Sequence, residues 1–483
     1  MTDDTAPAPS PALVWLRADL RFDDNPALRA AADSGRAVAC LYVLDDDTPG
    51  EWRMGGAQRW WLHHSLTAMQ ADFERFGGAL ILRRGDCRGV VPSVAEELGV
   101  GLVTWNRRYI GWQTEADADV KAALEEADHE VRTFRGTVMF EPGEILTGGG
   151  KPYKVYSPYW KKLQGRTRPE KAAKVTKLTA PETLPDTDAL ADWDLLPTKP
   201  DWSGGFAEWT PGERGARDRW LSWLKTDAAD YDDTRNLPAA DTTSRQSPHL
   251  HFGEISPIVA YDEVQDRIDA GEVPADQGRS WQSELAWREF HHQLLAAQPQ
   301  MFDEPLDQKF KDFEWDEDED AFRAWCYGKT GYPIVDAGMR QLYATGWMHN
   351  RCRMITGSFL VKDLLIDWRR GMAWFWDCLV CADPANNTAQ WQWIAGCGAD
   401  ASPFFRVFNP TGQGERFDKQ GDYIKRWCPE LAKLPARHVH APAAAPEDVL
   451  AKAGVVLGED YPYPIVDHAE RRDEALARYQ AIK

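Results

Sequence analysis

The chain has no run approaching the ~20 consecutive apolar residues that a membrane-spanning helix needs, so we expect no membrane association. It has only 8 cysteines in 483 residues, which excludes a disulfide scaffold and favours a reducing cytoplasmic location. The segment MTDDTAPAPSP has neither a basic n-region nor an apolar h-region. We therefore interpret residues 1–11 as a disordered leader and not as a signal peptide.

Basic residues are in the minority, because 56 Lys and Arg stand against 76 Asp and Glu, for a net charge of −20. An acidic chain is a weak candidate for binding nucleic acid, although a single positive face is enough to do so. The abundant residue is tryptophan, with 23 copies. This number indicates either a large aromatic core or, at some positions, stacking surfaces and electron carriers.

The first third of the chain alternates short apolar runs with amphipathic stretches. The runs ALVWLRADL, AVACLYVLD, GALILRRGD and GLVTWNRRY are typical of buried strands. Between and after them lie helical patterns, one ending at Gly77 and one running through TEADADVKAALEEADHEVRTF with an N-cap at Thr114. The alternation predicts a Rossmann-like α/β domain with a parallel, doubly wound sheet over residues 12–140. It contains no GxGxxG or GxxxxGK[ST] phosphate loop.

The pattern changes after residue 140. Residues 141–210 are rich in Pro, Lys, Thr and Gly, which predicts a long connector between domains. Helical periodicity then dominates residues 211–483, including the stretch MHNRCRMITGSFLVKDLLIDWRRG. The fold class is therefore an α/β N-terminal domain followed by an all-α C-terminal domain.

Two segments in the helical part carry candidate chemistry. DTTSRQSPHLHFGEISP can present hydroxyls and a helix N-terminus to a phosphate, although taken alone it is better explained as an ordinary Ser/Thr-rich turn. In SWQSELAWREFHHQLL, Glu284, Trp287 and His291 share one helix face at i, i+3 and i+7. That face suits a nucleobase, and its plainer interpretation is a core Trp beside a solvated Glu.

Three later segments add to these. MHNRCRMITG places Asn350 and Met354 at i, i+4 with arginines alongside, and DPANNTAQWQWIAG contains paired amides that need partners if buried. FFRVFNPTGQGERFD adds a loop able to meet a phosphate. The CLVC motif, Cys378 and Cys381, has no second pair at zinc spacing, so we predict no metal site.

These segments occur together in one family. With WLRADLRFDDNPAL and KTGYPIVDAGMRQLYATGWMHNR, they make the sequence resemble the photolyase/cryptochrome flavoproteins from Ala12 to Lys483. Within that family it is similar to bacterial cyclobutane pyrimidine dimer photolyases of classes I and III. The resemblance implies an antenna domain, a helical domain enclosing FAD, and dimer-containing DNA as the partner of a monomer at the nucleoid.

The resemblance also assigns residues. It implies that FAD is lined by Tyr231, Thr243, Ser244, Arg245, Gln246, Ser247, Trp281, Arg353, Asp383 and Asn387. It implies that the flipped dimer and its strand meet Arg235, Glu284, Trp287, Asn350, Arg351, Met354, Trp393, Arg406 and Gln413. Catalytic roles fall to Glu284, to Asn387 facing flavin N5, and to an electron relay of Trp391, Trp368 and Trp315. An Asn at the N5 position is the photolyase-like choice and should favour the anionic reduced flavin.

The sequence departs from the family pattern at two places. Cys381 stands where an Asp often pairs with an arginine like Arg353, so Arg353 is expected to use Asp383 or the flavin as its acceptor. Trp112 and Gln113 stand where folate-binding relatives have Asn-Glu. Methenyltetrahydrofolate is the preferred antenna, because a Trp can stack on a pterin, and a deazaflavin or a lumazine stays open.

The expected activity is repair of pyrimidine dimers by an electron from light-excited reduced FAD, which makes the chain a deoxyribodipyrimidine photo-lyase. A six-four photolyase is disfavoured because Asn350 and Met354 replace its His-x-x-x-His pair. The alternative is a cryptochrome-type blue-light photoreceptor, which the absence of a long segment after ARYQAIK disfavours.

Overall fold

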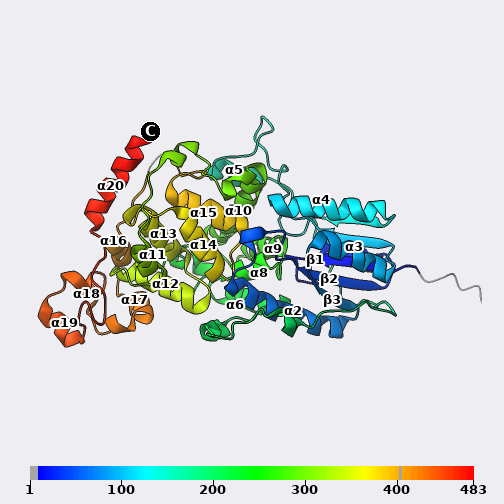
Figure 1. Cartoon of the computed structure of the whole chain (residues 1–483), viewed down its shortest axis with the longest axis horizontal. Helices are drawn as coiled ribbons and strands as arrows, with labels where there is room; N and C mark the ends of the chain where they lie inside the picture. The colour runs from blue at the N-terminus through cyan, green and yellow to red at the C-terminus, as the bar shows by residue number, and fades with distance from the viewer. Residues whose placement is uncertain (1–8, 402–404) are drawn as a thin grey trace, which may run out of the picture.

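The computed structural model describes residues 9–401 and 405–483, so residues 1–8 of the expected leader lie outside it. The first part of the chain forms a five-stranded, wholly parallel sheet in the order β3-β2-β1-β4-β5. This confirms the predicted doubly wound sheet, which lies on the right of Figure 1. The strands are β1 (Ala12–Leu16), β2 (Val38–Leu44), β3 (Ala79–Arg84), β4 (Leu102–Asn106) and β5 (Glu130–Phe134).

The central strands are mostly apolar because helices cover both faces of the sheet. Every residue of β1, β2 and β4 is buried. The long helix α2 ends where Gly77 adopts a φ of 82°, as the sequence predicted. The covering helices are α1 (Pro26–Asp33), α2 (Gly56–Phe76), α3 (Cys87–Leu98) and α4 (Gly111–Glu126).

The helix predicted from Thr114 through residue 134 is wrong at both ends. Helix α4 begins at Gly111, and the Thr114 hydroxyl donates to the Ile110 carbonyl (2.9 Å) inside its first turn. The last five residues of the predicted helix form β5 instead. This strand lies at the sheet edge and is half exposed, so its polar sequence lacks the apolar signature of the inner strands.

The segment 141–210 contains one α-helix, α5 (Tyr156–Gln164), and two short 3-10 turns, and otherwise runs without regular structure. It follows the sheet side of the molecule through backbone hydrogen bonds. Val38 N donates to Thr179 O (2.7 Å), and Leu178 N donates to Phe76 O (2.8 Å).

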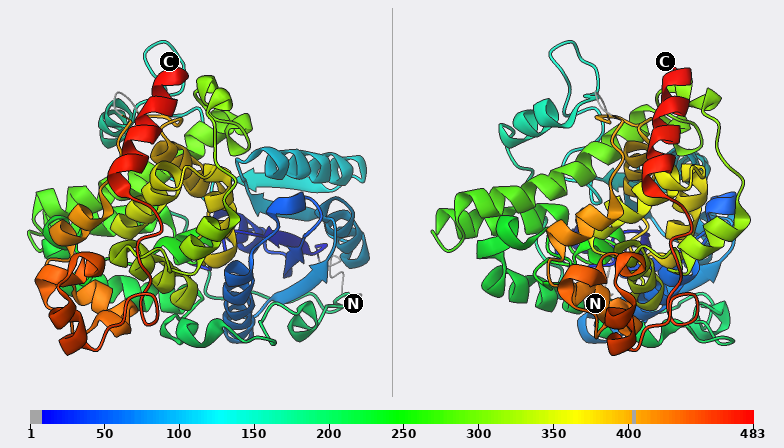
Figure 2. Two further views of the ribbon diagram at one scale, coloured as in Figure 1. Left: turned by 60° about the vertical axis from the view of Figure 1, so that its left-hand side comes forward. Right: turned by 90° about the vertical axis from the view of Figure 1, so that its left-hand side faces the viewer.

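The remainder is helical and lies to the left in Figure 1. Figure 1 and the left view of Figure 2 place α18 and α19 at the end remote from the sheet. Within the described ranges, no helix combines the length and the apolarity needed to cross a bilayer. The main helices are α6 (Glu213–Thr226), α7 (Tyr231–Thr234), α8 (Ser247–His251), α9 (Pro257–Asp269), α10 (Ala275–Ala297), α11 (Glu319–Cys326), α12 (Pro333–Thr345), α13 (Asn350–Ser358), α14 (Trp368–Cys378), α15 (Pro384–Ala395), α16 (Pro410–Phe417), α17 (Asp422–Trp427), α18 (Ala436–Val439), α19 (Glu447–Ala453) and α20 (His468–Ala481).

The stretch 348–371, predicted as helical, is interrupted. Helix α13 passes into a π-helical turn over Phe359–Asp363, and the chain then turns at Leu365, whose φ is 56°. Helix α14 begins only at Trp368. π-Turns are frequent at functional sites, and this one carries the buried Lys362.

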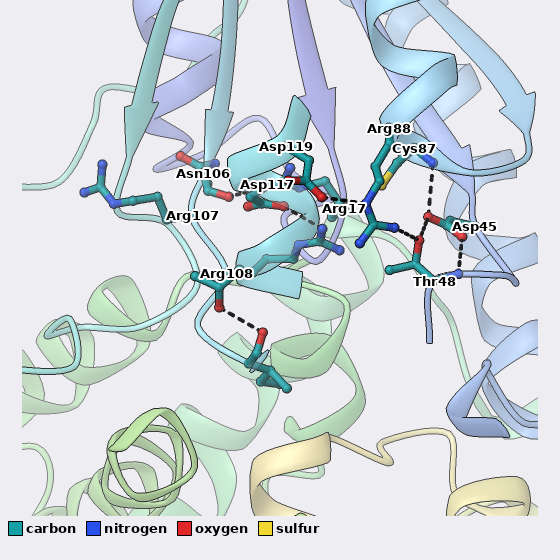
Figure 3. A network of polar contacts seen from close by, with 12 residues as sticks. Arg17, Asp45, Thr48, Cys87, Arg88, Asn106, Arg107, Arg108, Asp117 and Asp119 are labelled. Atoms are coloured by element: carbon teal, nitrogen blue, oxygen red, sulfur yellow. Dashed lines mark hydrogen bonds and ion pairs between the residues drawn. The ribbon is translucent and has the colours of Figure 1, made fainter. Parts of the chain in front are cut away.

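The carboxyl edge of the sheet, where an α/β fold usually binds a ligand, is occupied by the chain's own ions. Figure 3 shows Arg17, Arg108 and Asp117 at this edge. Asp117 pairs with Arg108 (2.6 Å) and with the buried Arg17 (3.3 Å). Arg17 lies after β1 and Arg108 after β4, so the network spans the point where the strand order reverses.

A nearby group of side chains has the composition of a metal site, but the carboxylate of Asp45 is already engaged by hydrogen-bond donors. The ligand atoms of Asp45, Asp86 and Cys87 lie within 4.8 Å of one another. The Asp45 carboxylate already accepts hydrogen bonds from Thr48 Oγ1 (2.6 Å), Thr48 N (2.9 Å) and Cys87 N (3.1 Å). Burial and Asp45 raise the pKa of the Cys87 thiol to about 12. We therefore interpret the group as joining the loop after β2 to the start of α3 (Figure 3).

A buried carboxylate joins the sheet part to the helical part. Glu254 accepts hydrogen bonds from Trp61 Nε1 of α2 (3.0 Å), from Ser65 Oγ, and from the Gly212 backbone N–H (2.7 Å). Its second oxygen faces His249 Nδ1 of α8 (2.5 Å). Because both Glu254 and His249 are fully buried, each of these donors depends on Glu254 for its partner.

Replacing Glu254 with Ala should lower the free energy of unfolding by about 3 kcal/mol, since several buried donors lose their acceptor together. Urea unfolding of the two proteins measures the change. Glu74→Ala, at an exposed position of α2, should stay within about 0.5 kcal/mol of the parent. Equal effects of the two substitutions would contradict the role given to Glu254.

Candidate functional site

A cavity of about 600 Å³ opens in the helical part. Its walls come from α10, α13, the segment joining α14 to α15, α15 itself, residues 399–401, and Arg406 with Phe408. Its volume lies in the range of small-molecule and cofactor sites. The following predicted residues line it: Arg235, Glu284, Trp287, Asn350, Arg351, Arg353, Met354, Asn387, Trp391, Trp393 and Arg406.

The wall formed by α10 brings together the face expected from the sequence. Glu284, Trp287 and His291 all border the cavity. Glu284 pairs with Arg235 Nη2 (2.5 Å) while its side chain stays about one-third exposed. A carboxylate held in this way keeps lone pairs available to a ligand beside the Trp287 ring.

The opposite wall begins with a capped helix. Asp383 caps α15 by accepting from Asn386 N (2.8 Å), and its other oxygen lies 3.4 Å from His292 Nε2. Burial alone would raise the pKa of Asp383, but His292 and neighbouring cations hold it well below its usual range. Asn387 is buried, and its Nδ2 donates to Met372 O (3.1 Å). Its amide oxygen is thereby left for the cavity.

Arg353 does not use Asp383, which was one of its two expected acceptors. Its Nη2 donates to Cys381 Sγ (3.3 Å) and its Nε to Met348 O (2.8 Å). Asp383 does not pair with it, because that carboxylate is engaged at the α15 cap. Among the described residues no carboxylate forms an ion pair with Arg353, so its charge faces the cavity without neutralisation.

The remaining predicted residues do not border this cavity. Thr243 and Ser244 border a second cavity of about 390 Å³ beside Arg219 and Trp223. Trp281 Nε1 donates to Ser244 Oγ (3.2 Å), which ties α10 to that segment. The others outside the main cavity are Tyr231, Arg245, Gln246, Ser247, Trp281, Asp383, Trp315, Trp368 and Gln413.

Arg245 holds a strained conformation. Its φ is 49°, a region that non-glycine residues seldom adopt and that costs about 1–3 kcal/mol. Its guanidinium pairs with Glu208 and with Asp241 (both 2.8 Å) and lies over the Trp347 ring (4.7 Å). Such strain at a predicted ligand-binding position is consistent with a backbone shaped for a ligand.

The three relay tryptophans differ in depth. Trp391 borders the cavity and is 4% exposed, Trp368 is 1% exposed, and Trp315 is half-buried. Within the described part of the chain, no ring contact joins these three directly. Trp391 instead contacts Phe375 (ring centroids 4.9 Å) and Trp325 (6.1 Å).

Trp112, the expected antenna contact, lies where the sheet part meets the helical part. Its ring packs edge-on against Phe302 (5.1 Å), which in turn contacts Trp52 (4.6 Å). Gln113 is half-buried beside it on α4.

Sequence reasoning missed several cavity residues. Arg288 follows Glu284 at i+4, a spacing that could have revealed it, and Lys362 is a charge within an apolar run, which is another usable signal. Asp400 carried no local signal, because it meets the cavity only through tertiary packing, whereas Asn386 is one of the paired amides of DPANNTAQWQWIAG that was not assigned to the site. Burial lowers the pKa of Lys362 well below its usual range, and its Nζ donates to Ala395 O (2.9 Å).

The cavity is cationic although the chain is acidic. Among the described residues that border it, only two are carboxylates, Glu284 and Asp400, and the cationic ones outnumber them. The cationic side chains are Arg235, Arg288, Arg351, Arg353 and Arg406. This imbalance favours an anionic ligand.

Buried polar atoms around the predicted flavin residues also call for a ligand. In the described residues, Arg245 Nε, Gln246 Oε1 and Arg351 Nε are buried without a hydrogen-bond partner. Buried polar groups are rarely left unpaired. The residues present therefore fit a large, polar and anionic cofactor such as FAD, which Arg353 and Asn387 would hold from the cavity side.

Comparison with known proteins also indicates an FAD-binding protein. Residues 12–181 match the DNA photolyase family model, and residues 281–481 match that of the FAD binding domain of DNA photolyase. The deoxyribodipyrimidine photo-lyase of Agrobacterium fabrum is 46% identical over 476 residues, covering 98% of each chain. Cryptochrome-1 of Arabidopsis thaliana is 34% identical over 482 residues, covering 96% of this chain and 69% of the relative. The crystal structure of a class III photolyase from Agrobacterium tumefaciens superposes with a TM-score of 0.96 at 45% identity, covering 100% of this chain and 99% of the other.

The sheet, the helical part and its cationic cavity thus define a two-part, FAD-binding flavoprotein. The chain belongs to the DNA photolyase family.

The buried histidines of this region make stability depend on pH. Burial lowers the pKa of His291 and of His251 to about 4 and that of His349 to about 3. The unfolded chain binds these protons from about pH 6.5 downward. Stability is therefore complete above about pH 6.5 and decreases as the pH falls toward 4.

We expect urea unfolding to give a free energy on the order of 2 kcal/mol lower at pH 5 than at pH 7 for each such histidine. His291→Asn should reduce that difference by one histidine's share, because the substituted side chain does not titrate. A free energy of unfolding that stays constant between pH 7 and pH 5 would contradict the burial assigned to these rings.

Proposed function

We propose that this chain repairs cyclobutane pyrimidine dimers in DNA under blue or near-UV light. One observation carries the proposal: a single cationic cavity is bordered both by the residues assigned to the flavin, Asn387 and Arg353, and by those assigned to the lesion, Glu284 and Trp287. Two ligands that enter this cavity would be close neighbours, as electron transfer between them requires.

On the flavin side, the chain supplies charge and orientation. Bound reduced FAD supplies, after absorbing light, the electron that splits both cyclobutane bonds and then returns, so that there is no net redox change. The unneutralised guanidinium of Arg353 favours an anionic ring system beside it. Asn387, held by its bond to Met372 O, offers an oxygen that accepts a hydrogen bond without supplying a proton.

On the lesion side, the chain supplies stacking surfaces and one acceptor. A damaged and poorly paired site costs less to extrude from the helix than a sound one. The rings of Trp287 and Trp393 offer planar faces for the extruded bases, and Met354 adds a polarizable contact. Glu284 accepts hydrogen bonds from the bases while Arg235 fixes its carboxylate.

The DNA backbone would meet a small set of polar groups. Arg351, whose Nη2 donates to Asn236 Oδ1 (2.6 Å), and the exposed Arg406 stand at the cavity, as does Asn350. Gln413 lies on α16, outside the cavity, so a phosphate contact there would lie farther along the strand. Binding that rests on a few cations weakens as salt rises.

We also assign the electron relay to Trp391, Trp368 and Trp315. These rings pass from the cavity wall through the core to a half-exposed position. Indole is oxidisable, so such a series can carry an electron from the surface toward the flavin. Phe375 and Trp325 pack against the first ring and keep it in place.

The second chromophore is the finer part of the proposal. We favour methenyltetrahydrofolate at the junction where Trp112 packs on Phe302. The buried ion network of Arg17, Arg108 and Asp117 occupies the carboxyl edge of the sheet, which argues against a ligand seated deep in that crevice. A deazaflavin or a lumazine remains the alternative.

Further features follow from the same proposal. Every candidate residue comes from one chain, so a monomer acting at the nucleoid suffices. We divide the chain into an antenna domain at 12–140, a connector at 141–210 and a catalytic domain at 211–483. The competing function is that of a cryptochrome-type photoreceptor, which would bind FAD without repairing DNA.

The test is illumination of the reduced protein with a dimer-containing oligonucleotide, measured as restored thymine absorbance. We expect repair by the parent protein and about fivefold less by Glu284→Ala, equivalent to about 1 kcal/mol in the barrier. The FAD absorbance should stay unchanged, because Glu284 is assigned to the lesion side.

Glu272→Ala is the matched control, since this exposed glutamate does not border the cavity. It should repair as the parent does. Bound FAD and bound DNA without any repair would favour the photoreceptor, and loss of FAD from Glu284→Ala would show that this face was misassigned.

Trp391→Phe should abolish light-driven reduction of oxidised flavin, because phenylalanine is far harder to oxidise than indole. Repair by chemically pre-reduced protein should persist. Flavin absorbance under illumination gives the first result and the oligonucleotide assay gives the second. Trp193→Phe, a buried tryptophan beside the sheet, should photoreduce normally, and equal loss in both variants would rule out the relay.

A further inference from the structure

One face of the Trp287 indole is covered by a second ring. The Tyr156 ring stacks on that face, with centroids 3.5 Å apart and planes inclined by 10°. Tyr156 is the first residue of α5, within the segment that the sequence predicted to be a connector. It is 6% exposed, whereas Trp287 borders the cavity and is half-buried.

Tyr156 is itself fixed at both ends. Its hydroxyl donates to Ser283 O (2.6 Å) and contacts Ser283 Oγ (2.7 Å), one turn of α10 before Trp287. Its backbone N–H lies close enough to the carboxylate of Asp400, another residue at the cavity, to offset part of the rise in the pKa of that carboxyl that burial causes. The edge of Phe290 closes the side of the stack (5.8 Å from each ring).

We propose that Tyr156 is a positioning residue for damage recognition, a role that rests on the proposed function. It acts through Trp287 by closing the rear face of the indole and holding the front face toward the cavity. A base that stacks there meets a ring already in its bound orientation, so little side-chain entropy is lost on binding. Without the phenol behind it, the indole can turn away from the cavity.

The same contact gives α5 a place in the site. A carboxylate beside the first turn of a helix is favoured by the helix dipole, and Asp400 lies in this way beside the backbone N–H of Tyr156. Because Tyr156 contributes to two parts of the wall, it couples the 141–210 segment to the cavity. A simple connector would have no such coupling.

Tyr159 provides a matched control one turn later in α5. It is 1% exposed and packs on Phe290 (5.2 Å), as Tyr156 does, but it makes no ring contact with Trp287 within the described part of the chain. Removing either ring costs the core a phenol of the same size. Only removal of Tyr156 frees the indole.

The experiment compares Tyr156→Met, Tyr156→Phe and Tyr159→Met as FAD-loaded full chains. Methionine keeps apolar volume without a flat face. Dissociation constants are measured for one oligonucleotide with a single thymine dimer and for the same oligonucleotide undamaged, and repair is measured as a function of substrate concentration. The parent protein is run in every series.

We expect Tyr156→Met to raise the dissociation constant for damaged DNA about tenfold and that for undamaged DNA less than about twofold. The half-saturating substrate concentration should rise, while maximal repair and FAD content stay near those of the parent. Tyr156→Phe, which keeps the stack, should restore discrimination. Tyr159→Met should discriminate as the parent does, even if its melting temperature falls.

The proposal is overturned if Tyr156→Met discriminates fully, or if Tyr159→Met loses as much discrimination as Tyr156→Met. Should Tyr156→Met not fold, Tyr156→His, which retains a smaller flat ring, must show an intermediate loss for the proposal to stand. Absence of repair by the parent protein would refute the proposed function instead, which keeps the two failures distinct.

Discussion

Positive charge enclosed by an acidic protein is the constraint on which the rest of the structure depends. Removing a guanidinium from water is costly unless an anion or a set of hydrogen bonds receives it. Arg235 is balanced by Glu284, and Arg288 by Glu289. Arg353 has only a thiol and a carbonyl, and Arg351 an amide and a thioether. The helices around the cavity therefore hold positive charge that a bound anionic ligand would neutralise.

Much of the fold could be predicted from the sequence, because its inner strands are mostly apolar on both faces and some of its helices, such as α2 and α12, end at a glycine. The edge strand β5 could not, since half of it faces solvent and its residues continue the periodicity of α4. The interruption of the predicted helix near Leu365 could not be predicted from the sequence either. A π-turn preserves the apolar pattern of a helix, and only the backbone reveals it.

The candidate site was predictable where its residues share one helix face. Glu284, Trp287 and His291 needed only the helical period, and Asn350 with Met354 needed a single i, i+4 step. The segment around Thr243 was selected through resemblance, because a Ser/Thr-rich turn alone is uninformative. Tyr156 and Asp400 were missed because the contacts that give them meaning join residues far apart in the chain.

The residue at position 381 determines how the positive charge of Arg353 is balanced in the cavity. A carboxylate at that position would neutralise Arg353 within the protein. The electrostatic free energy of the cavity would then be similar with and without a bound ligand. A thiol accepts only a weak hydrogen bond from the guanidinium. The anionic cofactor then supplies the missing charge, and it stabilises the folded state in proportion to the logarithm of its concentration. FAD is in this respect a component of the core of the helical domain as well as the source of its chemistry.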